Sequence, residues 1–161
     1  MIFSTGRTFL NRFDFIVQID GFGDAAFMTA SGLGAETSVI ENYEGGRSFP
    51  RKTPGRTTFS DVTLERGMTV GDVDFDTWYR QVMNASVSSP LSGTLGAGVG
   101  VPDLYKRQVD IVALGRDKTP AVRHRLFNAW PSAFSPGDYD ASSDELVVES
   151  LTLTYELFVR L

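Results

Sequence analysis

The sequence ETSVIENYEGGRSFPRKTPGRTTFSDVTLERG at residues 36–67 predicts a long hairpin, and the other elements can be placed around it. Two runs of alternating residues, 37–43 and 56–66, flank a segment that is too long for a tight turn. Pro50 and Pro54 remove two backbone donors from that segment, so a central strand is not expected there. The pattern favours a hairpin that projects outward.

The segment between the two arms is basic, although the chain as a whole is acidic. Fifteen basic and 20 acidic residues give a formal net charge of −5, which does not favour general binding to a polyanionic backbone. Arg47, Arg51, Lys52 and Arg56 are interleaved with Phe49 and the two prolines. A segment of this composition indicates a contact surface and not part of a core.

Composition excludes several classes of protein and site. With 161 residues, 42% of them hydrophobic, residues 1–161 suit a single domain with a sizeable core. The absence of cysteine excludes a disulfide, a thiolate metal site and a cysteine nucleophile. The N-terminus lacks the apolar core of a signal peptide, and no run approaches the roughly 20 apolar residues of a membrane span. We therefore expect a chain made in the cytoplasm, without a membrane partner.

Most of the remaining chain predicts β-strands, six or seven in all. Alternating patterns occur over 13–19, 107–114, 121–128 and 146–161, and a weaker strand is expected at 26–33. The last run keeps a strict period of two, so we expect it to be central to the core. The fold class is mainly β.

One segment has a helical period, and two others predict connections. Large apolar residues recur every three to four positions and predict a helix over 74–84, with Asp72 or Asp74 as its cap. Residues 84–103 are rich in glycine and serine and predict a flexible loop, either functional or ordered only on assembly; we favour the latter. Residues 129–143 are interpreted as a connection rich in Pro, Ser and Asp.

No motif in the sequence carries catalytic or metal chemistry. The single histidine, His124, has no accompanying serine and acid motif, and one histidine without cysteine does not favour a zinc site. The acids at 20–24 lack the spacing of a calcium loop, and the glycines at 96–100 do not match a phosphate-binding loop. The acids at 72–76 are explained by a helix start. We expect no catalytic residue, no metal and no cofactor.

Short motifs occur in order along nearly the whole chain. They are FDFIVQIDG at 13–21, SGL at 31–33, ET at 36–37, YEGG at 43–46, PG at 54–55, VTLERG at 62–67, Trp78, NAWP at 128–131 and ESLTLTYE at 149–156. Each motif is weak alone, but their order and spacing are specific. Together they resemble the tail tube protein family of contractile phages and of phage-tail-like extracellular contractile injection particles.

The resemblance implies a fold, an assembly and a set of partners. The implied fold is two orthogonally packed antiparallel sheets, a barrel-like sandwich, with one flanking α-helix and the projecting hairpin. The implied assembly is a stack of hexameric rings that forms the inner tube of a contractile tail. Its implied partners are further copies of itself, the sheath protein, and baseplate and terminator proteins. DNA or effectors would pass through the lumen without specific binding, in a virion tail or related particle assembled in the bacterial cytoplasm.

The hairpin is then expected to supply contacts between subunits. Acidic subunits need a local reversal of charge where they touch, and the basic segment provides it. Two alternatives stay open: a β-sandwich that binds a carbohydrate or peptide through Trp130 and Tyr139, and a hydrolase that uses His124. The residues expected at the subunit contact are Tyr43, Glu44, Arg47, Phe49, Arg51, Lys52 and Arg56.

Overall fold

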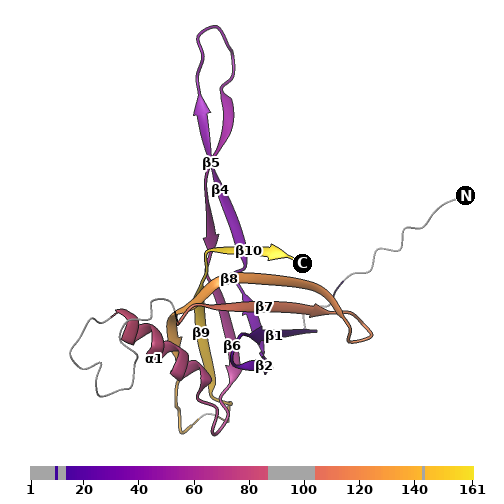
Figure 1. The fold of residues 1–161 in the computed structure, drawn as a ribbon, viewed down its shortest axis with the longest axis vertical. Helices are drawn as coiled ribbons and strands as arrows, with labels where there is room; N and C mark the ends of the chain where they lie inside the picture. The colour runs from indigo at the N-terminus through magenta and orange to yellow at the C-terminus, as the bar shows by residue number, and fades with distance from the viewer. Residues whose placement is uncertain (1–9, 11–13, 87–103, 143) are drawn as a thin grey trace, which may run out of the picture.

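The computed structural model describes residue 10 and residues 14–86, 104–142 and 144–161 (Figure 1). The glycine- and serine-rich segment expected at 84–103 lies outside the described residues from position 87 onward. In the described part of the chain, no helix has the length and apolar character needed to cross a membrane.

The described residues form ten strands and one helix. The elements are β1 (Phe15–Ile19), β2 (Gly23–Ala25), β3 (Thr29–Ser31), β4 (Gly34–Asn42), β5 (Arg51–Ser60), β6 (Val62–Gly67), α1 (Asp74–Ser86), β7 (Arg107–Leu114), β8 (Pro120–Ser135), β9 (Val148–Thr154) and β10 (Leu157–Arg160). The expected number of six or seven strands was too low because β2 was not expected, the returning arm of the hairpin ends in a separate strand, β6, and the last run is divided into β9 and β10. In the run at 146–161, β9 pairs with both β6 and the last part of β8, whereas β10 pairs with the first part of β8.

Strand β8 joins the two halves of the main sheet. Its first part pairs with β7 and β10, and its last part, Trp130–Ser135, pairs with β9. The sheet order is β2-β1-β7-β8-β9-β6-β3, all antiparallel, with β10 beside β8. In Figure 1, β7 and the first part of β8 run across the direction of β6 and β9. Such a crossing is typical of orthogonal packing, in which one strand turns a corner between layers.

This architecture confirms the expected mainly β fold with one helix, although the sheet does not close into a barrel. Its hydrogen-bonded order ends at β2 on one side and β3 on the other. The interpretation of 129–143 as a connection was wrong for its first part, because β8 continues to Ser135. Pro131 is tolerated there because the pairing with β9 shifts register between Pro131 and Ala133.

The corner of β8 lies at Asn128. This residue has a φ of +53°, in the left-handed region that asparagine tolerates better than most residues. Its side-chain Nδ2 donates a hydrogen bond of 2.7 Å to Oε2 of Glu156, next to the point where β9 gives way to β10. The two changes of direction are therefore linked by one side-chain contact.

The projecting hairpin is a separate two-stranded sheet made of β4 and β5. Its pairing runs from Gly34 opposite Ser60 to Asn42 opposite Arg51, so it is displaced from the expected span of 36–67. Strand β6 is not part of it, because Val62 and Leu64 are fully buried between β3 and β9. The segment expected to be a loop is strand from position 51 onward. A two-stranded ribbon has free edges, where a proline can be accommodated.

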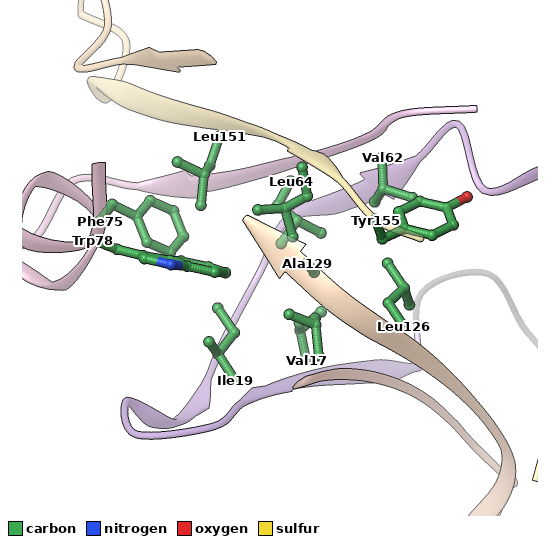
Figure 2. Packing of buried hydrophobic residues seen from close by; sticks show 12 residues of the cluster. Val17, Ile19, Val62, Leu64, Phe75, Trp78, Leu126, Ala129, Leu151 and Tyr155 are labelled. Atoms are coloured by element: carbon green, nitrogen blue, oxygen red, sulfur yellow. The ribbon is translucent and has the colours of Figure 1, made fainter. Parts of the chain in front are cut away.

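The core lies between the two crossing parts of the sheet and is covered at one end by α1 (Figure 2). Phe75 and Trp78 of the helix are 1% and 0% exposed. The indole Nε1 of Trp78 donates a hydrogen bond of 2.6 Å to the carbonyl oxygen of Tyr105. The helical period therefore identified the buried face correctly. The remaining buried members are Val17, Ile19, Val62, Leu64, Val109, Leu126, Ala129, Leu151, Leu153 and Tyr155.

A buried arginine fixes the start of α1 to the sheet. Nε of Arg66 lies 2.5 Å from Oε1 of Glu149, and its Nη1 lies 2.8 Å from Oδ2 of Asp72. The guanidinium carbon lies 3.8 Å from the centre of the Phe75 ring. Asp72 also accepts a hydrogen bond from the backbone N of Asp74, as expected of a helix cap. One charged group thus connects β6, β9 and the helix.

We expect Trp78→Ala to lower the free energy of unfolding by about 3–5 kcal/mol, because it removes a fully buried ring and leaves a cavity. Arg80→Ala is the matched control on the same helix. The Arg80 side chain is 64% exposed and pairs with Asp76, so its loss should change stability by less than about 0.5 kcal/mol. Denaturant unfolding of both variants measures the difference. Equal losses would contradict the assignment of α1 to the core.

Candidate functional site

Beyond Phe59, which packs against the core, the hairpin of β4 and β5 extends away as a ribbon that is exposed along nearly its whole length in the described structure (Figure 1). Nearly every residue along both strands is exposed, including Val39 at 62% and Ile40 at 49%. A two-stranded ribbon is marginally stable in water by itself. Exposed apolar side chains on such a ribbon indicate a surface that a partner covers.

The tip of the hairpin, residues 41–52, carries two exposed aromatic residues. Tyr43 is 79% exposed and Phe49 is 71% exposed. The chain reverses between them with a φ of +90° at Gly46, a conformation that glycine adopts without strain. The ends of β4 and β5 hold Asn42 opposite Arg51, which brings both flanks of the tip together.

The structure brings six of the seven expected contact residues to this tip. Arg56 is the exception, since it lies further along β5 at a bulge, where its backbone N donates to Oγ of Ser38 at 2.9 Å. Sequence reasoning grouped it with the others because residues 51–56 were expected to be loop. A strand of five residues spans roughly 16 Å, which separates Arg56 from the tip.

Two glutamates offset part of the positive charge at the tip. Glu44 pairs with Arg47 at 3.5 Å and with Arg51 at 3.4 Å, and Glu41 pairs with Lys52 at 3.4 Å. Residues 41–52 hold three cations and two carboxylates, so the tip has a net charge of +1 (3 − 2) on a chain of net charge −5. The paired side chains are 41–66% exposed. Such pairs contribute only about 0–1 kcal/mol and can be exchanged for other partners.

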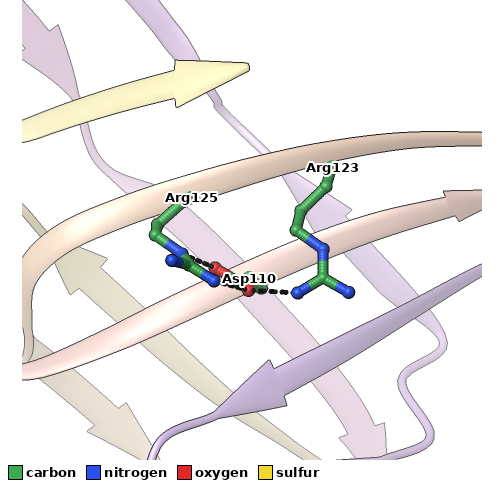
Figure 3. A network of polar contacts seen from close by, with 3 residues as sticks. All are labelled: Asp110, Arg123 and Arg125. Atoms are coloured by element: carbon green, nitrogen blue, oxygen red, sulfur yellow. Dashed lines mark hydrogen bonds and ion pairs between the residues drawn. The ribbon is translucent and has the colours of Figure 1, made fainter. Parts of the chain in front are cut away.

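A second charged cluster, among the residues that the structure describes, is a cross-strand clamp on β7 and β8 (Figure 3). Asp110 is 7% exposed and accepts two hydrogen bonds of 2.8 Å from Arg125 and one of 2.9 Å from Arg123. The hydrogen bond from Arg125 is the main cause that lowers the pKa of Asp110, against the opposing effect of burial. A carboxylate held in this way is structural and is a poor general base.

His124 lies on β8 between the two arginines of the clamp, on the other face of the strand. Its ring is half-buried and lies 6.3 Å from the ring of Phe158 in an edge-on arrangement. Within the described segments, no side chain is found hydrogen-bonded to its ring, and no group of three or more His, Asp or Glu residues is placed to hold a metal ion. The geometry offers no hydrolytic constellation around this residue.

The two aromatic residues of the alternative binding site contact different parts of the structure. Trp130 packs edge-on against Tyr105, at 5.9 Å between ring centres. Tyr139 is 74% exposed, and its hydroxyl lies 3.5 Å from Sδ of Met68. They do not form one platform for a carbohydrate or a peptide.

Sequence reasoning missed an exposed surface around Tyr139. The interpretation of 129–143 as a plain connection hid it. One signal was present: residues 136–147 contain four carboxylates and no lysine or arginine. A one-sided charge of this kind, next to an exposed tyrosine and Leu146, indicates more than a turn.

Comparison with protein families gives one match that spans most of the chain. The family described as T4-like virus tail tube protein gp19 matches residues 11–159. A comparison with curated proteins gives no match.

Comparison with solved structures gives the same fold. A chain of the cryo-EM sheath-tube complex of PVC, an extracellular contractile injection system in the extended state, has a TM-score of 0.75 and 20% identity, over 94% of this chain and 90% of that one. A chain of the six-fold symmetrised baseplate of the anti-feeding prophage has a TM-score of 0.73 and 22% identity, over 96% and 97%. Hcp1 from Flavobacterium johnsoniae has a TM-score of 0.57 and 12% identity, over 94% of each chain.

The clamp around Asp110 predicts how stability depends on pH. Because its pKa is lowered in the folded state, its contribution is present above the ordinary value of 3.8 and is lost as pH falls through the lower folded value. We expect Asp110→Asn to lower the free energy of unfolding by about 1–3 kcal/mol at pH 7. The difference from the wild type should shrink below pH 4.

Urea unfolding of both proteins from pH 7 to pH 3 measures this difference. Asp144→Asn is a suitable control, because this carboxylate is exposed and has no ion pair with any described residue. A constant gap between wild type and Asp110→Asn over the whole range would show that the clamp does not titrate as described.

Proposed function

Because the chain belongs to the family of the T4-like virus tail tube protein gp19, we propose that its copies form six-membered rings that stack into the hollow inner tube of a contractile tail or injection particle. The chain is a structural tube protein with a mainly β fold. The observation that carries the proposal is the family match over residues 11–159 on a fold that leaves a long hairpin without a partner. The alternative of a ligand-binding sandwich has no such support.

The solved relatives support the number of subunits and the neighbours of the tube. One lies in a six-fold symmetrised baseplate, and another lies in a sheath-tube complex. For this chain we propose rings of six, a sheath protein around the tube, and terminator and baseplate proteins at its ends. The tube is assembled in the bacterial cytoplasm and functions in a virion tail or a related particle.

The tube is a conduit and has no catalytic role in this proposal. DNA or effectors pass through its lumen without specific binding. A net charge of −5 on each subunit supports this view for DNA, because an acidic wall repels phosphates and does not retain them. Charged side chains of the kind that act as acids or bases in enzymes hold strands together in this fold. Asp110, for example, accepts hydrogen bonds from Arg123 and Arg125.

The hairpin tip is the proposed contact between subunits. Its residues Tyr43, Glu44, Arg47, Phe49, Arg51 and Lys52 combine exposed aromatic area with exchangeable ion pairs. Aromatic residues and arginines dominate the energetics of many interfaces. Arg56, further down the ribbon, extends the basic surface toward the body of the subunit.

Reversal of the four cations tests this role. We expect Arg47→Glu, Arg51→Glu, Lys52→Glu and Arg56→Glu together to leave the fold intact, since these side chains are exposed. Tube growth should be lost, because clustered like charges at an interface cost several kcal/mol at every repeated contact. Tube length by negative-stain electron microscopy and thermal melting of the unassembled protein measure the two effects.

A charge-preserving variant is the matched control. Arg47→Lys, Arg51→Lys, Lys52→Arg and Arg56→Lys change the same positions but keep the sign of each charge, so tubes should still grow. If the reversed variant polymerises to full length at low salt, the hairpin is not an electrostatic contact and its proposed role is wrong.

A further inference from the structure

The end of the molecule opposite the hairpin tip carries a second group of exposed apolar side chains. They lie on two loops, residues 68–73 after β6 and residues 136–147 before β9, at the lower end of the long axis in Figure 1. We call these two loops the distal face. Its exposed apolar members are Met68 (40%), Val70 (103%), Val73 (60%), Tyr139 (74%) and Leu146 (82%).

The two loops of the distal face are fixed to each other. The backbone N of Met68 donates a hydrogen bond of 2.9 Å to the carbonyl oxygen of Val147. The Tyr139 hydroxyl lies 3.5 Å from Sδ of Met68. Between residues 138–141 and 145–147 the surface forms an open depression of about 450 Å³. The distal face is thus a shaped surface with a hollow that is lined by both apolar side chains and carboxylates.

The charged residues of this hollow are all acidic. Asp138, Asp140 and Glu145 line it, and Asp144 lies beside it in sequence. The Ser142 hydroxyl donates a hydrogen bond of 2.7 Å to Asp140, which lowers the pKa of this carboxyl and keeps it charged. Asp138 and Asp144 form no ion pair with any residue that the structure describes. A complementary partner therefore needs an exposed apolar side chain with positively charged side chains beside it.

We propose that the distal face receives the hairpin tip of a second copy of this chain, from the adjacent ring. The tip has the required chemistry, since exposed Phe49 lies in sequence between Arg47 and Arg51. The two arginines can exchange Glu44, an exposed partner, for Asp138 and Asp140 at little cost. This inference rests on the proposed function and names the surface that completes its contact.

The placement of the two surfaces on the subunit agrees with this occupant. The tip and the distal face lie at opposite ends of the longest axis (Figure 1). A contact between different patches on identical subunits is head-to-tail, and it repeats indefinitely when the symmetry does not close it. Two acidic distal faces repel each other, which disfavours face-to-face stacking. The charges therefore set the polarity of the stack as well as its affinity.

A charge exchange between two variants tests the inference. The tip variant carries Arg47→Glu, Arg51→Glu and Lys52→Glu, and the face variant carries Asp138→Lys, Asp140→Lys and Asp144→Lys. Each variant alone presents like charges at every contact between rings. We expect the mean tube length of each to fall about tenfold or more, because like charges then meet at every contact.

Mixing the purified rings of the two variants is the decisive step. The acidic tip of one variant then meets the basic face of the other, and the remaining contact is the wild-type pair, so alternating tubes should grow. A third variant with both sets of changes should polymerise alone. Thermal melting of each protein verifies folding. If the Asp140 change disturbs the turn made with Ser142, Asp138→Lys with Asp144→Lys tests the same face.

The possible outcomes separate this inference from the proposed function. If the wild-type protein forms tubes and the face variant also polymerises normally, the inference is overturned but the tube assignment stays intact. Failure of the folded variants to form tubes on mixing would also overturn it. A wild-type chain that forms neither rings nor tubes would overturn the proposed function together with the inference.

Discussion

The exchange of partners along β8 is the constraint on which the rest of the structure depends. One continuous strand pairs with β7 up to Ala129 and with β10 up to Phe127, and it pairs with β9 from Trp130 onward. The two parts of the sheet therefore cross, and their apolar faces enclose Leu64, Leu126 and Leu151. Helix α1 covers one end of that space with Trp78. Among the described residues, the β4–β5 hairpin contacts this core at its base, through Phe59, and the rest of it projects.

The hairpin connects this fold to assembly. A ribbon that exposes Val39, Tyr43 and Phe49 buries little apolar area by itself, and we propose that another chain covers it. The proposed tip and distal face place unlike surfaces at the two ends of one subunit. Stacking then needs no change of fold and no enzymatic step. The ring at each end of such a stack exposes either unoccupied hairpin tips or unoccupied distal faces. A further ring can therefore bind, and the tube can grow.

The local patterns of the sequence predicted much of the fold. The spacing of Phe75 and Trp78 identified the helix and its buried side, and the alternation around Thr37 identified the hairpin. Features that depend on distant partners were not predictable in this way. The continuation of β8 through Pro131 depends on a register shift against β9, and the pairing of Glu44 with two arginines depends on how the tip folds back. The distal face was missed because loops 68–73 and 136–147 are far apart in sequence.

We propose that this chain assembles into a tube through its hairpin. Electron cryomicroscopy of the purified wild-type protein tests it most directly, because it reveals both the oligomer and the surroundings of the tip. We expect hollow stacks of six-membered rings with Phe49 of one ring against Tyr139 or Leu146 of the next. Monomers at all protein and salt concentrations, or tubes in which the hairpin tip contacts no other subunit, would contradict it.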